Sequence, residues 1–212
     1  VVVGPEQPLC DGLVDQMSQS GIKCFGPSRQ AAQLEGSKSF SKDFLKKHKI
    51  PTANYKTFTD VDSANNYLDS HQYPCVIKAD GLAAGKGVVI AETKEQAKAT
   101  SKDMLAGNAF GDAGHRVVIE DFLVGEEASF IVVSDGKDFK PMATSQDHKA
   151  RDDGDKGPNT GGMGAYTPAP VVTQAVYEKT IEKIINTIPE EREINSEKNN
   201  EISKKNQNNI NS

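Results

Sequence analysis

The sequence contains no tryptophan, few cysteines and no long run of apolar residues. A helix that crosses a bilayer needs about 20 mostly apolar residues, so we expect no membrane span and no membrane partner. Basic residues are outnumbered, since 25 Lys and Arg stand against 30 Asp and Glu, for a formal net charge of −5. This balance argues against a general nucleic-acid binder, which uses basic charge to displace counterions from phosphates. No basic segment followed by an apolar one marks a secretory signal.

The three cysteines, Cys10, Cys24 and Cys75, are odd in number and have no Cys-x-x-Cys spacing. They fit neither a disulfide framework nor a zinc site. They suit a reducing compartment, so we expect a cytoplasmic protein. We interpret them as small buried or half-buried thiols rather than as catalytic groups.

Apolar periodicity, turn residues and helix caps predict alternating strands and helices. The order strand–helix–strand–helix in the first 36 residues is typical of a parallel α/β unit. Capping boxes are expected at Thr59 with Asp62 and at Thr93 with Gln96, and residues 145–164 are expected to form a long polar loop. Strands are predicted at residues 1–3, 23–25, 54–58, 75–79, 88–91, 116–121, 128–134 and 140–144, and helices at 9–20, 28–34, 37–48, 59–68, 93–106 and 173–188.

The composition changes after residue 188. Residues 189–212 contain seven Asn and only three apolar residues, all of them Ile. Such a segment buries too little apolar surface to offset the entropy of ordering the chain. We therefore expect a disordered, low-complexity tail.

A glycine-rich segment, VIKADGLAAGKGVVIAE at residues 76–92, is the first candidate site. It is one residue short of P-loop spacing, Gly87 replaces the hydroxyl residue, and a strand rather than a helix follows. We predict a glycine-rich flap between two antiparallel strands, with backbone N–H groups and the lysines Lys78 and Lys86 facing phosphate oxygens. An ordinary mobile hairpin is the alternative.

Two further segments carry polar chemistry. In VIEDFLVGEEASF, at residues 118–130, backbone groups at 121–123 could pair with an adenine edge and Glu127 with ribose hydroxyls, although a solvated acidic turn fits equally well. Residues 146–166 combine glycines, which offer backbone donors to an anion, with Asp147, His148, Lys149, Asn159 and Thr160. His148 and its acidic neighbours have no recognisable metal-ligand spacing, so no metal site is predicted.

Several motifs in register resemble one enzyme family. These three segments, together with GPEQPL at residues 4–9, CFGPS at 24–28, QLEGSKSFSKDF at 33–44 and GPNTGGMGAYTPAP at 157–170, are similar to glycinamide ribonucleotide synthetases, the phosphoribosylamine–glycine ligases of the ATP-grasp superfamily. The resemblance runs from Val1 to about Ile188. It implies an α/β fold with three parts: the C-terminal part of a Rossmann-like N-terminal substrate domain at residues 1–36, an incomplete ATP-grasp domain at 37–188, and the tail at 189–212.

The resemblance also implies site residues. Lys38 and Lys78 look like the lysines that hold ATP phosphates, and residues 81–87, including Gly85, Lys86 and Gly87, look like the flap over them. Glu120, Asp121, Phe122 and Leu123 resemble the strand that reads adenine, and Glu127 resembles the ribose carboxylate. The implied substrate side comprises Gly4, Pro5, Glu6, Asp147, His148, Lys149, Asn159, Thr160, Gly161 and Met163. Lys78, Asp147 and Lys149 are the implied catalytic residues.

The function implied by the resemblance is ATP-dependent ligation of glycine to 5-phosphoribosylamine, giving glycinamide ribonucleotide, ADP and phosphate in de novo purine biosynthesis. Mg²⁺ or Mn²⁺ is expected with ATP. The family's magnesium-ligand stretch is not found in the sequence, so this chain alone is expected to be impaired or inactive. A truncated nucleotide-binding module without catalysis is the alternative, and an ATP-grasp ligase for another amine is disfavoured by GPNTGGMGAY. Fusion to other purine-pathway domains in the full-length protein is left open.

Overall fold

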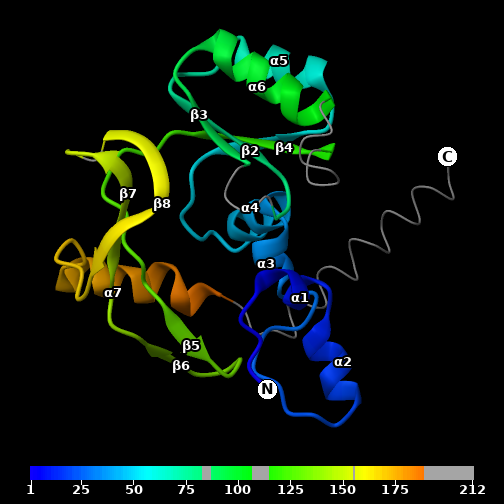
Figure 1. Ribbon diagram of the computed structural model, residues 1–212, viewed down its shortest axis with the longest axis vertical. Coiled ribbons are helices and arrows are strands. Elements are labelled where there is room, and N and C mark those ends of the chain that lie inside the picture. Colours follow the sequence, from blue (N-terminus) through cyan, green and yellow to red (C-terminus); the bar gives the residue numbers. More distant parts are fainter. Residues whose placement is uncertain (83–86, 107–114, 155, 189–212) are drawn as a thin grey trace, which may run out of the picture. The chain divides into compact units, whose positions relative to one another are not determined.

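The computed structural model describes residues 1–82, 87–106, 115–154 and 156–188 (Figure 1). The described residues form two compact units, one from Val1 to Leu123 and a second that begins at Val124. This division follows contacts in space, and the predicted domain boundary after residue 36 stays a prediction. The expected tail at 189–212 lies outside the described residues.

The first unit is built on a four-stranded antiparallel sheet with strand order β1-β4-β2-β3. The strands are β1 (Tyr55–Phe58), β2 (Cys75–Ala79), β3 (Val88–Ala91) and β4 (Val117–Asp121). The bounds predicted for β2 and β3 are confirmed, as is their antiparallel pairing. The pairing continues one step toward the glycine-rich segment, where the N–H of Ala79 donates to the carbonyl of Gly87 at 2.8 Å.

Two helices, α5 (Val61–Leu68) and α6 (Lys94–Ala106), lie side by side over one face of this sheet (Figure 1). Side chains alternate between the two faces of a strand, and in β2 it is Cys75, Ile77 and Ala79 that are buried. They pack with Leu68 of α5, Ile119 of β4 and other fully buried side chains into one apolar core. The other face of the sheet is left for polar residues such as Lys78.

Helix caps are partly as predicted. The hydroxyl of Thr93 accepts from the N–H of Gln96 at 3.2 Å, which confirms the cap before α6. The cap predicted at Thr59 is wrong, because α5 begins one residue later and the carboxylate of Asp60 accepts from the N–H of Ser63 at 2.7 Å. Asp is as good an N-cap as Ser or Thr, so the two neighbouring candidates could not be separated by residue type.

The N-terminal part of the first unit contains α1 (Glu6–Cys10), α2 (Leu13–Gln19), α3 (Gln33–Gly36) and α4 (Lys38–Lys47). The single helix predicted at residues 9–20 is wrong: Gly12, at φ 89°, breaks it into two. The helix predicted at 28–34 is also misplaced, since the chain turns at 28–32 and becomes helical only at Gln33. The predicted first strands reduce to a parallel bridge between Val2 and Phe25.

The second unit contains two hairpins and a helix. They are β5 (Val132–Ser134) with β6 (Phe139–Pro141), β7 (Gln146–Asp152) with β8 (Lys156–Tyr166), and α7 (Gln174–Lys183) followed by a short 3₁₀ turn at Ile185–Thr187. The loop predicted at 145–164 is therefore wrong, because most of it is the β7–β8 hairpin. Register shifts near Ala150 interrupt the alternation of apolar and polar residues by which a strand is recognised. The many glycines of the segment favoured a loop in the sequence analysis.

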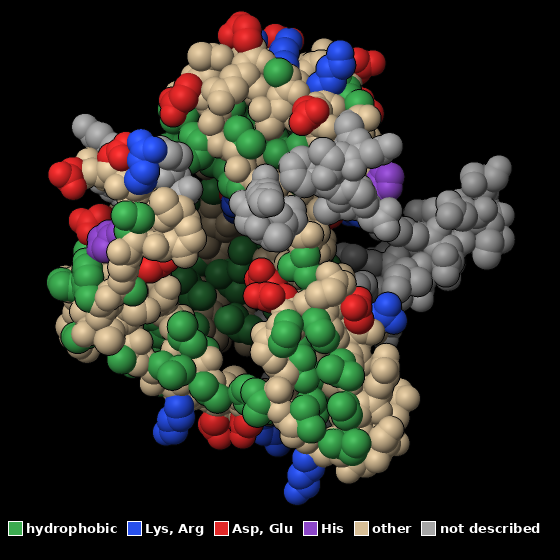
Figure 2. Space-filling model, viewed as in Figure 1, with side chains coloured by type: hydrophobic (Ala, Val, Ile, Leu, Met, Phe, Trp, Pro, Cys, Tyr) green, Lys and Arg blue, Asp and Glu red, His purple; other side chains and the backbone are tan. Residues whose placement is uncertain are grey.

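The helices and the surface charge can be compared with the expected absence of a membrane span and of nucleic-acid binding. Within the described ranges, no helix has the length and apolar character needed to cross a bilayer. On the face shown in Figure 2, acidic and basic side chains lie interspersed over α5 and α6. This part of the surface therefore does not present a field of a single sign.

Cys75 is fully buried in the core, and burial, with a smaller contribution from Asp121, raises the pKa of its thiol to about 11. The thiolate is the reactive form, so its fraction at pH 8 falls about a hundredfold relative to an ordinary cysteine. We expect iodoacetamide at pH 8 to label the half-buried Cys24 much faster than Cys75 in the folded chain, and both alike in urea. Peptide mass spectrometry measures this, and equal labelling of the folded chain would contradict it.

Candidate functional site

A cavity of about 720 Å³ lies in the first unit, on the side of the sheet away from α5 and α6. Its volume is within the range of small-molecule sites. Among the described residues, its wall combines three lysines and three glutamates with other polar, small and apolar residues: Glu6, Gln7, Leu34, Glu35, Lys38, Ser41, Lys42, Lys78, Gly81, Leu82 and Glu120. The structure thus brings together Glu6, Lys38, Lys78 and Glu120, which the sequence placed in four separate motifs.

Glu120 is nearly fully buried in this wall, with 5% of its side chain exposed, and it pairs with two of the lysines. Lys78 and Glu120 are diagonal neighbours on one face of β2 and β4, since Lys78 pairs with Val118, and long side chains reach across such a diagonal. The Nζ of Lys78 lies 3.0 Å from Oε1 of Glu120, and the Nζ of Lys42 lies 2.8 Å from Oε2. One carboxylate therefore fixes two ammonium groups at the cavity.

Lys38 enters the same cavity from the first turn of α4, one turn before Lys42, so the two lysines share a helix face. Its Nζ donates to the carbonyl of Gly81 at 2.6 Å. Burial lowers the pKa of Lys38, the carboxylate of Asp80 opposes that change, and the charge of Lys78 adds to it. A partly desolvated ammonium next to a second one favours an anion between them, and phosphate is a typical ligand for such a pair.

The strand end after Glu120 is more open. The side chain of Asp121 accepts from the amide of Asn54 at 2.7 Å and lies 3.6 Å from Nε2 of His71. Phe122 and Leu123 are exposed, at 37% and 69%. Their side chains are thus accessible at the end of the first unit.

A second group of predicted residues lies in the second unit, on β7 and the segment before it. The Nζ of Lys149 lies 3.1 Å from Oε1 of Glu127 and 3.8 Å from Oδ2 of Asp147. The hydrogen bond and charge of Glu127, with a smaller contribution from Asp147, raise the pKa of Lys149. The ring of His148 packs at 5.3 Å from that of Tyr166. The side chains of Asp147 and Lys149 therefore lie on the same side of β7, and their predicted role toward substrate stays a prediction.

The remaining predicted residues lie on the β7–β8 hairpin or before α1, or fall outside the described residues. Thr160 donates its hydroxyl to the carbonyl of Lys149 at 3.0 Å, Gly161 follows it in β8, and Met163 is exposed. Pro5 caps α1 and Gly4 precedes it, both outside the cavity wall that Glu6 joins. Gly85, Lys86 and the side chain of Asn159 lie outside the described residues.

Sequence reasoning missed Lys42, Glu35 and Asp80. Lys42 was detectable as the residue one helical turn after Lys38. Glu35 lines the cavity from α3, whose position in the sequence was predicted incorrectly. Asp80 is held by residues 41 to 43 positions earlier in the chain, and such pairing is not visible in a single sequence.

Replacing Glu120 by Gln tests the charge pairing in this wall. Without the carboxylate, Lys42 and Lys78 lose their shared partner in a buried position, and we expect the free energy of unfolding to fall by about 1–3 kcal/mol. Urea denaturation measures the change, and Glu92→Gln, at an exposed position, is the matched control. An unchanged midpoint for Glu120→Gln would mean that the pairs do not stabilise the fold.

Two family models match the chain: "Phosphoribosylglycinamide synthetase, N domain" over residues 1–35 and "Phosphoribosylglycinamide synthetase, ATP-grasp (A) domain" over residues 36–200. Phosphoribosylamine–glycine ligase of Escherichia coli K12 is 65% identical over 184 residues, which are 87% of this chain and 43% of that protein. The enzyme of the same name from Pseudomonas aeruginosa is 62% identical, with the same coverage. The chain thus spans less than half the length of the curated relatives it matches.

Solved structures agree with the family models. Phosphoribosylamine–glycine ligase from Thermotoga maritima has a TM-score of 0.74 and 34% identity, over 88% of this chain and 46% of that one. D-alanine–D-alanine ligase from Bacillus anthracis, solved with ATP, has a TM-score of 0.59 and 22% identity, over 84% of this chain and 55% of that one. The second likeness shows the fold alone. Together these matches confirm the predicted α/β, ATP-grasp fold class.

Proposed function

Because this chain belongs to the phosphoribosylglycinamide synthetase family, we propose that the protein ligates glycine to 5-phosphoribosylamine with ATP, giving glycinamide ribonucleotide, ADP and phosphate. The family resemblance read from the sequence motifs is confirmed by the family models. The observation that carries the proposal is the convergence of Lys38 and Lys78 on one cavity, since two ammonium groups from different elements suit the phosphates of a nucleotide.

The proposed chemistry has two steps. A carboxylate oxygen of glycine attacks the γ-phosphorus of ATP, the bond to ADP breaks, and an acyl phosphate forms. The amine of 5-phosphoribosylamine then attacks the acyl carbon, phosphate leaves, and the nitrogen loses a proton. Phosphoryl transfer is catalysed mostly by positioning and by stabilising charge on phosphate oxygens. Lys38 and Lys78 would supply that stabilisation from fixed positions.

The other assignments are proposals of the same kind. Residues 120–123 would read adenine through backbone groups, since the side chain of Glu120 is already engaged by two lysines. Phe122 and Leu123 are exposed and apolar, as contact with a purine ring requires. In the second unit, Glu127 would take the ribose, and Asp147 with Lys149 would face the ribose-phosphate substrate. Glu6 would contribute to the substrate side from the cavity wall.

Magnesium would accompany ATP and, when bound, would supply positive charge that stabilises negative charge on phosphate oxygens. Among the residues that the structure describes, no three His, Cys, Asp or Glu gather in a way that could hold a metal ion. We therefore assign no magnesium ligand to the described residues. The part proposed for them is to hold and orient the nucleotide.

A chimera of the E. coli enzyme tests the proposal. The 184 matched residues of this chain replace their counterparts, and phosphate release is measured with ATP, glycine and freshly prepared 5-phosphoribosylamine. We expect release that requires both substrates, and its loss in a chimera that also carries Lys78→Ala. Calorimetry with the 212-residue chain adds a direct measure of ATP binding. Release that does not need glycine would contradict the ligase, and ATP binding without ligation would favour the nucleotide-binding module.

A further inference from the structure

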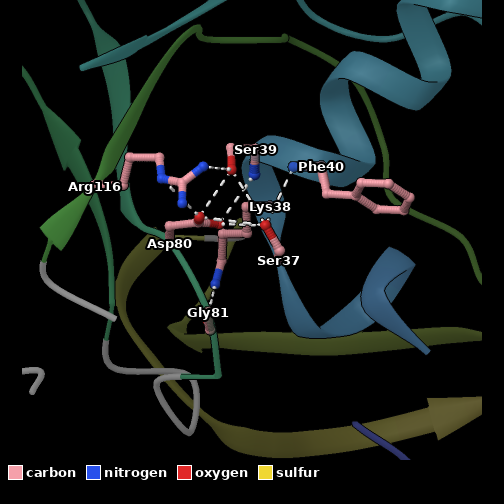
Figure 3. Close-up of polar contacts among 7 residues, drawn as sticks. All are labelled: Ser37, Lys38, Ser39, Phe40, Asp80, Gly81 and Arg116. Carbon is pink, nitrogen blue, oxygen red and sulfur yellow. Dashed lines mark hydrogen bonds and ion pairs between the residues drawn. The ribbon is translucent and has the colours of Figure 1, made fainter. Parts of the chain in front are cut away.

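Asp80 follows β2 directly, and only 10% of its side chain is exposed. Its carboxylate accepts hydrogen bonds from the backbone N–H of Ser39 at 3.0 Å, the hydroxyl of Ser39 at 2.8 Å and the hydroxyl of Ser37 at 3.1 Å. The Nε of Arg116 lies 3.5 Å from Oδ2 of Asp80, and its Nη1 donates to Ser39 Oγ at 3.3 Å. These groups converge on Asp80 from the start of α4 and from the residue before β4 (Figure 3).

Lys38 lies between the two serines that Asp80 holds. Its ammonium reaches the carbonyl of Gly81, the residue after Asp80, at 2.6 Å (Figure 3). Asp80 thus restrains the chain on both sides of Lys38, and its neighbour Gly81 binds the end of the side chain. Of the seven residues drawn in Figure 3, all of them described, Lys38 and Gly81 line the cavity and the other five do not.

We propose that Asp80 is the positioning residue for Lys38: it fixes the direction in which the Lys38 ammonium enters the cavity, and it affects nucleotide binding only through that lysine. The effect on nucleotide rests on the proposed function, whereas the effect on Lys38 does not.

A simple helix cap does not account for this set of contacts. Ser37 already caps α4, since its hydroxyl accepts from the N–H of Phe40 at 3.2 Å. The bonds of Asp80 come in addition to that cap, and a carboxylate with several charge-assisted bonds is a rigid support. Its negative charge also stabilises the protonated form of Lys38, against the opposing effects of burial and of Lys78.

A double-mutant cycle on the 212-residue chain separates positioning from structure. ATP affinity is measured by calorimetry for the wild type, Asp80→Asn, Lys38→Ala and the double variant. We expect Lys38→Ala to weaken binding about tenfold or more, and Asp80→Asn about threefold to tenfold. Since Asp80 acts through Lys38, the double variant should bind as Lys38→Ala does. Additive losses, or no loss in Asp80→Asn, would overturn the proposal.

Asp60→Asn is the matched control. Asp60 is the N-cap of α5 as Asp80 is a partner of the α4 N-terminus, and it is not part of the cavity wall. Asn remains an N-cap, so Asp60→Asn should fold. Asp80→Asn keeps the size of the side chain and its oxygen acceptor, and its folding is checked by the same thermal melt as the control. We expect Asp60→Asn to bind ATP as the wild type does. An equal loss of affinity in this control would mean that Asp80→Asn acts through general destabilisation, which would overturn the proposal.

A second measurement needs no nucleotide. Lysine amines are dimethylated with ¹³C, Lys38 is assigned with Lys38→Arg, and its signal is titrated by NMR in the wild type and in Asp80→Asn. The charged neighbours Lys78, Glu35 and Glu120 are the same in both, so a difference reports on Asp80. Loss of the carboxylate should move the Lys38 midpoint to lower pH. An unchanged midpoint overturns the inference. Failure of the wild type to bind ATP counts against the proposed function, while the titration still decides the role of Asp80.

Discussion

Replacing Lys78 by Ala should weaken ATP binding about tenfold or more, because a charge-assisted contact to a phosphate is worth about 1.5–3 kcal/mol. The Lys78 ammonium is held 3.0 Å from Glu120 at the cavity, with 26% of its side chain exposed. Little entropy is then lost when it meets a ligand, since the side chain is already ordered. Isothermal titration calorimetry on the purified chain measures the change.

The control for Lys78 is Lys98→Ala. Lys98 also forms an ion pair, at 2.8 Å from Asp69, but it lies on α6, away from the cavity wall. We expect its loss to leave ATP affinity within about twofold, since exposed ion pairs contribute little. Equal affinity in the wild type and in Lys78→Ala would exclude Lys78 as a phosphate ligand.

Replacing Leu68 by Ala should lower the free energy of unfolding of the first unit by about 2–5 kcal/mol. Leu68 ends α5 and is 0% exposed among the side chains of β2 and β4, so the variant loses apolar burial and leaves a cavity. Close packing prevents the neighbours from filling that space completely. Chemical denaturation followed by circular dichroism measures the loss.

Leu123→Ala removes the same atoms at a position that is 69% exposed. We expect its effect on stability to stay within about 0.5 kcal/mol, as for surface substitutions in general. Similar losses for the two variants would contradict the core described around Leu68.

The central sheet was predictable because its strands are short apolar runs between clear turn signals. Cys75–Ala79 and Val88–Ala91 have the same bounds in the sequence analysis and in the structure. The β7–β8 hairpin was not predictable, since main-chain hydrogen bonds rather than an apolar pattern hold it together. The break at Gly12 was missed because apolar periodicity continues across it, while the left-handed backbone does not appear in the pattern.

In the candidate site, the residues that line the cavity were predictable where a family motif marks them, while their roles stay predictions. Lys38 and Lys78 were singled out from family motifs, and both line the cavity. Glu120 was expected to read adenine, yet the carboxylate itself is occupied by Lys42 and Lys78. That arrangement depends on the antiparallel register of β2 with β4 and on the packing of α4. Neither is contained in the local sequence around Glu120.

In the part of the cavity wall that the structure describes, lysines and glutamates are equal in number, and this balance has a kinetic consequence. An anionic nucleotide approaching from solution meets a chain of net charge −5 and a site whose opposite charges largely cancel at a distance. At an ionic strength of about 0.1 M, salt also screens most of the remaining electrostatic field beyond about 10 Å. The site should therefore not draw its ligand in by electrostatic steering, and the association rate constant should not fall as ionic strength rises. Discrimination among anions would then lie in their dissociation rate constants and not in their association rate constants.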